Sequence, residues 1–159
     1  ITHKDSLGNE GRTEAGDVQV MSAGSGIRHA EYNLESEATT IFQIWIMPNR
    51  KGGSPSWGAK PFPKGNRSGA WQILASGMEG DTEALPIRTN ARVVGATLKA
   101  GESLSYEVGT GRYAYLVPAT GAVEIDGLRA NARDGVAIKE GSITVTALEE
   151  AEIVLVDSQ

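Results

Sequence analysis

The chain has 159 residues, a net charge of −5 and no cysteine, so disulfides, thiolate nucleophiles and cysteine-based zinc sites are excluded. Its acidic balance, with the basic residues between positions 50 and 67 interrupted by proline and glycine, argues against nucleic-acid binding. No apolar run approaches the ~20 residues of a membrane span, and no signal peptide is visible, so we expect a soluble, cytoplasmic protein with no membrane partner.

The beginning of the chain predicts two short strands. The sequence starts at Ile1 rather than at methionine, and residues 1–9, ITHKDSLGN, have the pattern of a strand that runs into a turn. We therefore expect either a segment upstream of Ile1 in the gene or cleavage at that point. Residues 18–21 predict the second strand, and a loop broken by glycines follows it.

The loop leads into a His-x-Glu pair, His29 and Glu31. Side chains at positions i and i+2 of a strand leave the same face, so this pair can place an imidazole and a carboxylate on one cation. These two ligand types suit Fe(II), Mn(II), Ni(II), Cu(II) or Zn(II). A polar surface pair explains the same spacing, so the pair alone leaves both interpretations open. A Ser-His-Asp arrangement around Ser22 or Ser25 also stays open, although nothing places its third member.

The middle of the chain predicts a buried strand followed by a linker. Residues 40–47, TIFQIWIM, are apolar at nearly every position, which is typical of a strand covered on both faces. Residues 48–70 hold four of the six prolines and predict an irregular linker between two domains. We expect Trp57 and Phe62 to hold this linker against a barrel, and a lid over a pocket is the alternative.

The remaining residues, 71–159, predict an all-β domain. Strand patterns cover residues 92–98, 103–108, 113–117, 122–125, 136–139, 142–147 and 152–156. Asp126-Gly127 is a two-residue hairpin signal, and the regular spacing indicates a sandwich or barrel. Residues 76–85 are a weak helix candidate because they contain two glycines. Residues 92–159 contain no histidine or cysteine, so we expect no transition metal there.

The spacing of Gly16, Gly24, Gly26, His29 and Asn33 resembles the second sequence motif of the cupin superfamily. The GDVQ strand, the AGSGI loop and the H-x-E pair are more similar still to the pirins, as are ITHKDSLGN, TIFQIWIMP and AEIVLVD. The resemblance implies an all-β, double-stranded β-helix fold with two barrels, a bicupin. Residues 1–47 would form the C-terminal part of the first barrel, residues 48–70 the linker, and residues 71–159 a complete second barrel without metal.

The resemblance also implies a metal site. Pirins bind one metal in the first barrel through three histidines and a glutamate, and two of those positions correspond to His29 and Glu31. The other two histidines belong to an H-x-H motif that this chain lacks, and His3 lies after its expected place, so we expect His3 to be structural. Two ligands are too few for a tight site. We expect weak metal binding or none by this chain alone, and a complete site, with Fe(II) as the first candidate, together with its own N-terminal segment.

The activity that the resemblance implies is dioxygen-dependent ring opening of a flavonol such as quercetin. Glu31 would be both a metal ligand and the base that takes the proton of the substrate hydroxyl. His29 would be a ligand only. The alternatives are a regulatory pirin that binds a protein partner without catalysis, or an inactive proteolytic fragment.

Overall fold

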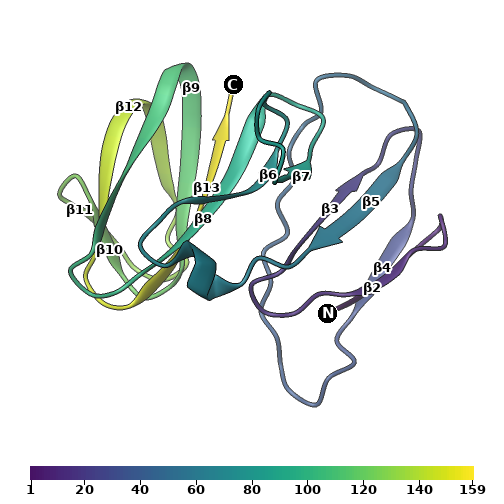
Figure 1. The fold of residues 1–159 in the computed structure, drawn as a ribbon, viewed down its shortest axis with the longest axis horizontal. Helices are drawn as coiled ribbons and strands as arrows, with labels where there is room; N and C mark the ends of the chain where they lie inside the picture. The colour runs from purple at the N-terminus through teal and green to yellow at the C-terminus, as the bar shows by residue number, and fades with distance from the viewer.

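A computed structural model describes residues 1–159 and is built almost entirely of β-strands in two groups (Figure 1). The first group contains β1 (Thr2–Asp5), β2 (Glu10–Arg12), β3 (Val18–Ser22), β4 (His29–Tyr32) and β5 (Ser56–Lys60). These strands form two small antiparallel sheets, one in the order β2-β1-β4 and the other pairing β3 with β5. We call this group the first half.

The second half is one eight-stranded sheet. A 3₁₀ helix, η1 (Lys64–Arg67), precedes it, and its strands are β6 (Gln72–Ser76), β7 (Leu85–Pro86), β8 (Ala91–Leu98), β9 (Ser103–Thr120), β10 (Val123–Ile125), β11 (Leu128–Ala130), β12 (Val136–Ala147) and β13 (Ala151–Ser158). Their order is β11-β10-β12-β9-β13-β8-β6-β7, and every pair except β6–β7 is antiparallel. The all-β prediction is confirmed. No helix has the length and hydrophobicity needed to cross a membrane.

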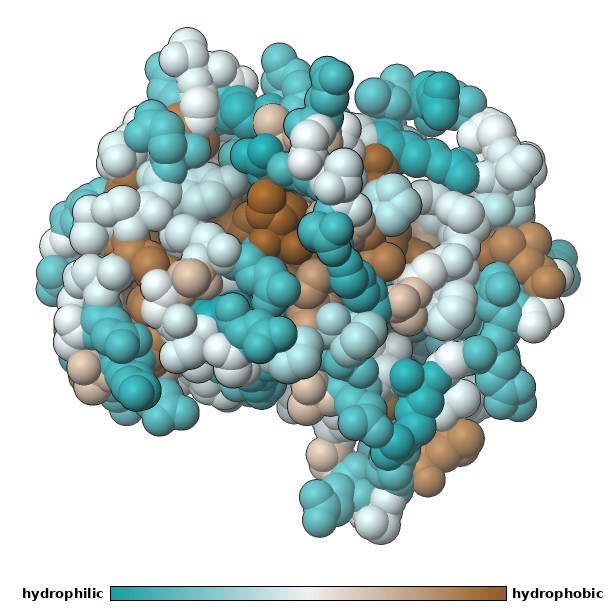
Figure 2. All heavy atoms as spheres, in the orientation of Figure 1, coloured by the Kyte–Doolittle hydropathy of each residue, from teal (hydrophilic) through white to brown (hydrophobic).

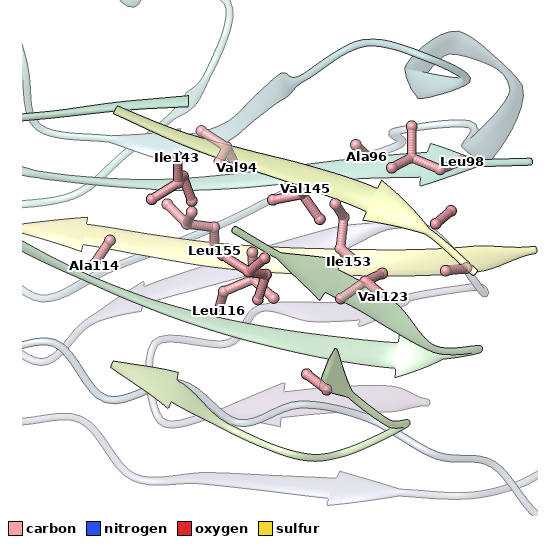
Figure 3. Packing of buried hydrophobic residues seen from close by; sticks show 14 of the residues in the cluster. Val94, Ala96, Leu98, Ala114, Leu116, Val123, Ile143, Val145, Ile153 and Leu155 are labelled. Atoms are coloured by element: carbon pink, nitrogen blue, oxygen red, sulfur yellow. The ribbon is translucent and has the colours of Figure 1, made fainter. Parts of the chain in front are cut away.

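The core of the second half lies where the sheet folds over on itself. Alternate residues of its long strands point inward, as the two-residue period of a strand requires. Figure 3 shows these side chains gathered between the strands, among them Leu116 on β9, Val145 on β12, and Ile153 and Leu155 on β13. These four residues are at most 1% exposed. The barrel interior is therefore filled with apolar side chains.

Two long strands, β9 and β12, were each predicted as two shorter strands. The patterns at residues 103–108 and 113–117 belong to β9, and those at 136–139 and 142–147 belong to β12. The glycines between them produce a register shift between Lys139 and Gly141 in place of a turn. The hairpin at Asp126-Gly127 is confirmed: both residues have positive φ, +47° and +88°, and Ile125 pairs with Leu128.

The prediction of a buried strand at residues 40–47 is wrong. This segment belongs to no sheet, and Trp45 and Met47 are 87% and 84% exposed. An apolar extended segment becomes a strand only where a neighbour supplies hydrogen-bond partners, and no strand of residues 1–159 pairs with it. Residues 76–85 form no helix either; they leave β6 through a turn and enter β7.

The proline-rich segment is more regular than predicted. Pro55 and Pro61 bracket β5, which pairs with β3 through five residues, so irregular structure throughout 48–70 is a wrong prediction. Proline is tolerated at the ends of an edge strand, which explains how the strand fits between them.

Phe62 holds this segment against the second half, as expected from its size. It is 2% exposed and belongs to a cluster with Leu74, Leu85 and Val93, against which Val18 of β3 and other partly buried residues pack. Because this cluster takes side chains from both halves, it joins them. Figure 2 shows hydrophobic atoms in the middle of this face, where the halves adjoin.

Candidate metal site

The H-x-E pair lies on β4, and its two side chains leave the same face of the strand. β4 pairs with β1 so that His3 is opposite Glu31 and Asp5 is opposite His29. The pairing therefore brings both histidines of the chain and two carboxylates to one face of the sheet. Lys4 and Ala30 alternate to the other face.

The glycine loop before β4 is a tight turn against the segment that follows residue 50. Gly24 has φ +55°, and a Cβ atom there would lie 2.5 Å from the carbonyl oxygen of Gly53. The backbone N–H of Ser25 donates to the same oxygen at 2.8 Å. Only glycine combines this backbone conformation with so close an approach, which explains its place in the motif. Neither Ser22 nor Ser25 hydrogen-bonds to His29.

Trp57, on β5 of the opposing sheet, contacts the histidine of β1. Its ring stacks on His3 with a centroid distance of 4.9 Å and an interplanar angle of 9°. His3 in turn stacks on His29 at 5.7 Å and 20°. A Cβ atom at Gly11 would lie 2.4 Å from Cη2 of Trp57, so the missing side chain at position 11 leaves room for the indole.

A second contact runs through Gln19 on β3. Its Oε1 atom accepts a hydrogen bond from Nε1 of Trp57 at 3.2 Å, and its Nε2 atom donates to Oε1 of Glu31. Trp57 is therefore connected to both members of the H-x-E pair, to His29 through His3 and to Glu31 through Gln19. Gln19 had no predicted role here, and Trp57 was expected in the linker. The GDVQ strand, which contains Gln19, was the one sequence feature that could have indicated a role for Gln19 at the site. No local pattern indicated such a role for Trp57.

His3 is buried and occupied by structural contacts. It is 1% exposed, and its Nε2 atom lies 3.0 Å from Oδ2 of Asp5. Burial raises the pKa of Asp5, but hydrogen bonds from His3, from Asn9 and from the Leu7 backbone outweigh it and hold that pKa well below its usual range. The Nδ1 atom of His3 has no hydrogen-bond partner.

The imidazole of His29 and the carboxylate of Glu31 fit a divalent transition metal, but two donors do not complete a metal site. His29 is exposed and Glu31 is partly buried. No group of three or more His, Cys, Asp or Glu side chains in residues 1–159 is arranged to hold a metal ion. Even open catalytic sites usually have three protein ligands.

Family models match both halves of the chain. The model described as Pirin matches residues 1–46, and the model described as Quercetinase C-terminal cupin domain matches residues 73–158. The chain is 69% identical to a pirin-like protein of Caulobacter vibrioides, over 99% of the chain and 68% of that protein. It is 33% identical to quercetin 2,3-dioxygenase of Escherichia coli K12, over 99% of the chain and 67% of that enzyme.

A solved structure has the same fold. The bacterial pirin YhhW of Escherichia coli, in complex with nickel(II), superposes with a TM-score of 0.87 at 32% identity, over 99% of this chain and 67% of that one. The shared fold includes both halves of the chain.

Proposed function

Because this chain belongs to the pirin family of cupins, we propose that it is part of a metal-binding protein with quercetin 2,3-dioxygenase-type activity. The observation that carries the proposal is the placement of His29 and Glu31 on one face of β4, beyond a loop with the glycine spacing of the family. A relative that is a quercetin 2,3-dioxygenase supports the reaction class. The substrates would be a flavonol and dioxygen.

The proposed organisation is that of a bicupin. Residues 1–47 would be the C-terminal part of a first barrel, residues 48–70 the connection, and residues 71–159 a second barrel without metal. The separate family matches to the two halves support this division. The pairing of β5 with β3 adds that part of the connection also belongs structurally to the first half.

His29 and Glu31 would be two ligands of the metal. A four-ligand site would need two further donors from outside residues 1–159, since His3 is engaged with Asp5. The nickel complex of a relative supports a divalent transition metal, and Fe(II), Mn(II), Ni(II), Cu(II) and Zn(II) are the candidates. Glu31 would also take the proton of the substrate hydroxyl.

The test is quercetin turnover by the full-length gene product loaded in turn with Fe(II), Mn(II), Ni(II) or Cu(II). We expect turnover with at least one metal and a loss of about 10²–10⁴-fold in Glu31→Gln. The control is Glu124→Gln, which changes an exposed carboxylate of β10 in the second half. Turnover by none of the metals would rule out the enzyme, and full activity in Glu31→Gln would rule out the base role alone.

A second candidate function, regulatory binding of a protein partner without catalysis, is favoured by one observation. Residues 40–47 present Ile41, Phe42, Trp45 and Met47 to solvent, and exposed apolar groups of this size commonly mark interaction sites. A defined stoichiometric complex of the full-length protein, together with no turnover of quercetin, would support this candidate over the enzyme.

A further inference from the structure

The geometry points to a positioning device made of Gln19, Trp57 and His3, which we call the Trp57 bridge. We infer that the bridge orients His29 and Glu31 before any metal binds. The effect of the bridge on metal affinity rests on the proposed function. The orientation of the two side chains in the metal-free protein does not depend on the proposed function.

One arm of the bridge reaches His29 by stacking. The Trp57 indole lies parallel to His3, and His3 lies on His29, so three flat rings form one stack. His3 is fixed within this stack because Asp5 holds its Nε2 atom at 3.0 Å, and Asp5 is itself held by Asn9. An exposed histidine at the end of a strand otherwise samples several rotamers, so a fixed ring beneath it restricts its orientation.

The other arm reaches Glu31 by hydrogen bonds. Gln19 uses both ends of its amide, accepting from Trp57 and donating to one carboxylate oxygen of Glu31. An amide that makes both bonds cannot rotate without losing them. The hydrogen bond from Gln19 thereby fixes the direction of the other oxygen of Glu31, and this oxygen can bind a ligand or take a proton.

Trp57 is the residue on which both arms depend. It lies 38 residues from Gln19 in the chain and reaches the site because β5 pairs with β3. Gly11 leaves space for its ring, since any side chain there would collide with the indole. The bridge thus connects the two small sheets of the first half across their facing surfaces. Contacts of this kind around a metal ligand typically affect affinity 10–100-fold.

The first experiment uses the metal-free full-length gene product and follows the imidazole proton signals of His3 and His29. We expect Trp57→Leu to shift the ring protons of both His3 and His29, because the stack is lost. The matched control is Trp71→Leu, since Trp71 also donates through Nε1, to the carbonyl oxygen of Ser105, but lies in the second half. The control should leave both sets of signals unchanged.

The second experiment measures Ni²⁺ affinity by calorimetry in the full-length gene product. We expect Trp57→Leu and Gln19→Leu to weaken binding about 10–100-fold and Trp71→Leu to change it less than about twofold. His3→Phe keeps a flat ring in the stack but removes both ring nitrogens. Because the ring contact remains but Asp5 no longer holds the ring, binding should weaken no more than in Trp57→Leu if His3 positions His29. Abolished binding would show that His3 is a ligand and would overturn its place in the bridge.

The outcomes separate the two proposals. A wild-type protein that binds no Ni²⁺ contradicts the metal function, while the histidine signals still decide on the bridge. Unchanged His29 signals in Trp57→Leu, or unchanged affinity in both Trp57→Leu and Gln19→Leu, would overturn the bridge even if the wild type binds metal. If Trp57→Leu fails to fold, Trp57→Phe takes its place: it should keep the stack and the His29 signals but lose the bond to Gln19 and, with it, about 10–100-fold in metal affinity.

Discussion

Asp81 and Arg92 form a largely buried ion pair at the end of β6. The guanidinium donates from Nε to Oδ2 at 2.6 Å and from a terminal nitrogen to Oδ1 at 3.0 Å, and Ser76 donates to Oδ2 as well. The Arg92 hydrogen bond lowers the pKa of Asp81 below its usual range, against the opposing effect of burial. The charged form is therefore favoured in the folded protein.

A pH dependence follows from the lowered pKa of Asp81. Its contribution to stability is fully present above the unfolded-state pKa, about 4, and is lost as the pH falls through the folded-state value. We expect Asp81→Asn to lower the free energy of unfolding by about 1–3 kcal/mol at pH 7. Urea unfolding at pH 7 and pH 3 should show the difference from wild type shrinking at the lower pH. A difference that stays constant between the two would contradict the ion pair.

The loop between β3 and β4 determines where β4, the strand that carries the H-x-E pair, begins. Gly24→Ala introduces a strained positive φ and a contact of 2.5 Å with the Gly53 carbonyl oxygen, so both loops must shift. We expect a loss of about 1–3 kcal/mol in the free energy of unfolding, together with movement of the His29 signals. The control is Gly8→Ala, which has a similar φ of +88° but open space around it. Equal effects of the two substitutions would show that φ alone matters.

Some strands of this chain can be predicted from its sequence and others cannot. The strands β8, β9, β10, β12 and β13 of the second half lie where the sequence predicts strands, because alternation along each one is a local property of the chain. Residues 40–47 have an equally strong apolar pattern, yet they lie in no sheet and are largely exposed. β5 was missed because two prolines flank it. Whether a segment is a strand depends on its neighbour, and the neighbour is distant in sequence.

At the scale of the molecule, Phe62 packs in the cluster that joins the two halves. It is 2% exposed, and Phe62→Ala should cost about 3–5 kcal/mol, because the large ring leaves a cavity between β-sheets. The chain contains only one other phenylalanine, Phe42, which is 47% exposed. Phe42→Ala is the matched control and should cost less than about 1 kcal/mol. The comparison is made by chemical unfolding, and equal losses would contradict the packing role of Phe62.

Residue patterns alone indicate the β-class, the H-x-E pair of His29 and Glu31, the glycine loop before it and the family resemblance. Each of these depends on residue types at short spacing. The folded structure adds that Trp57, far along the chain, lies over His3, that Gln19 links it to Glu31, and that no strand pairs with residues 40–47. Sheet pairing and side-chain stacking join positions tens of residues apart, and no local pattern specifies which positions meet.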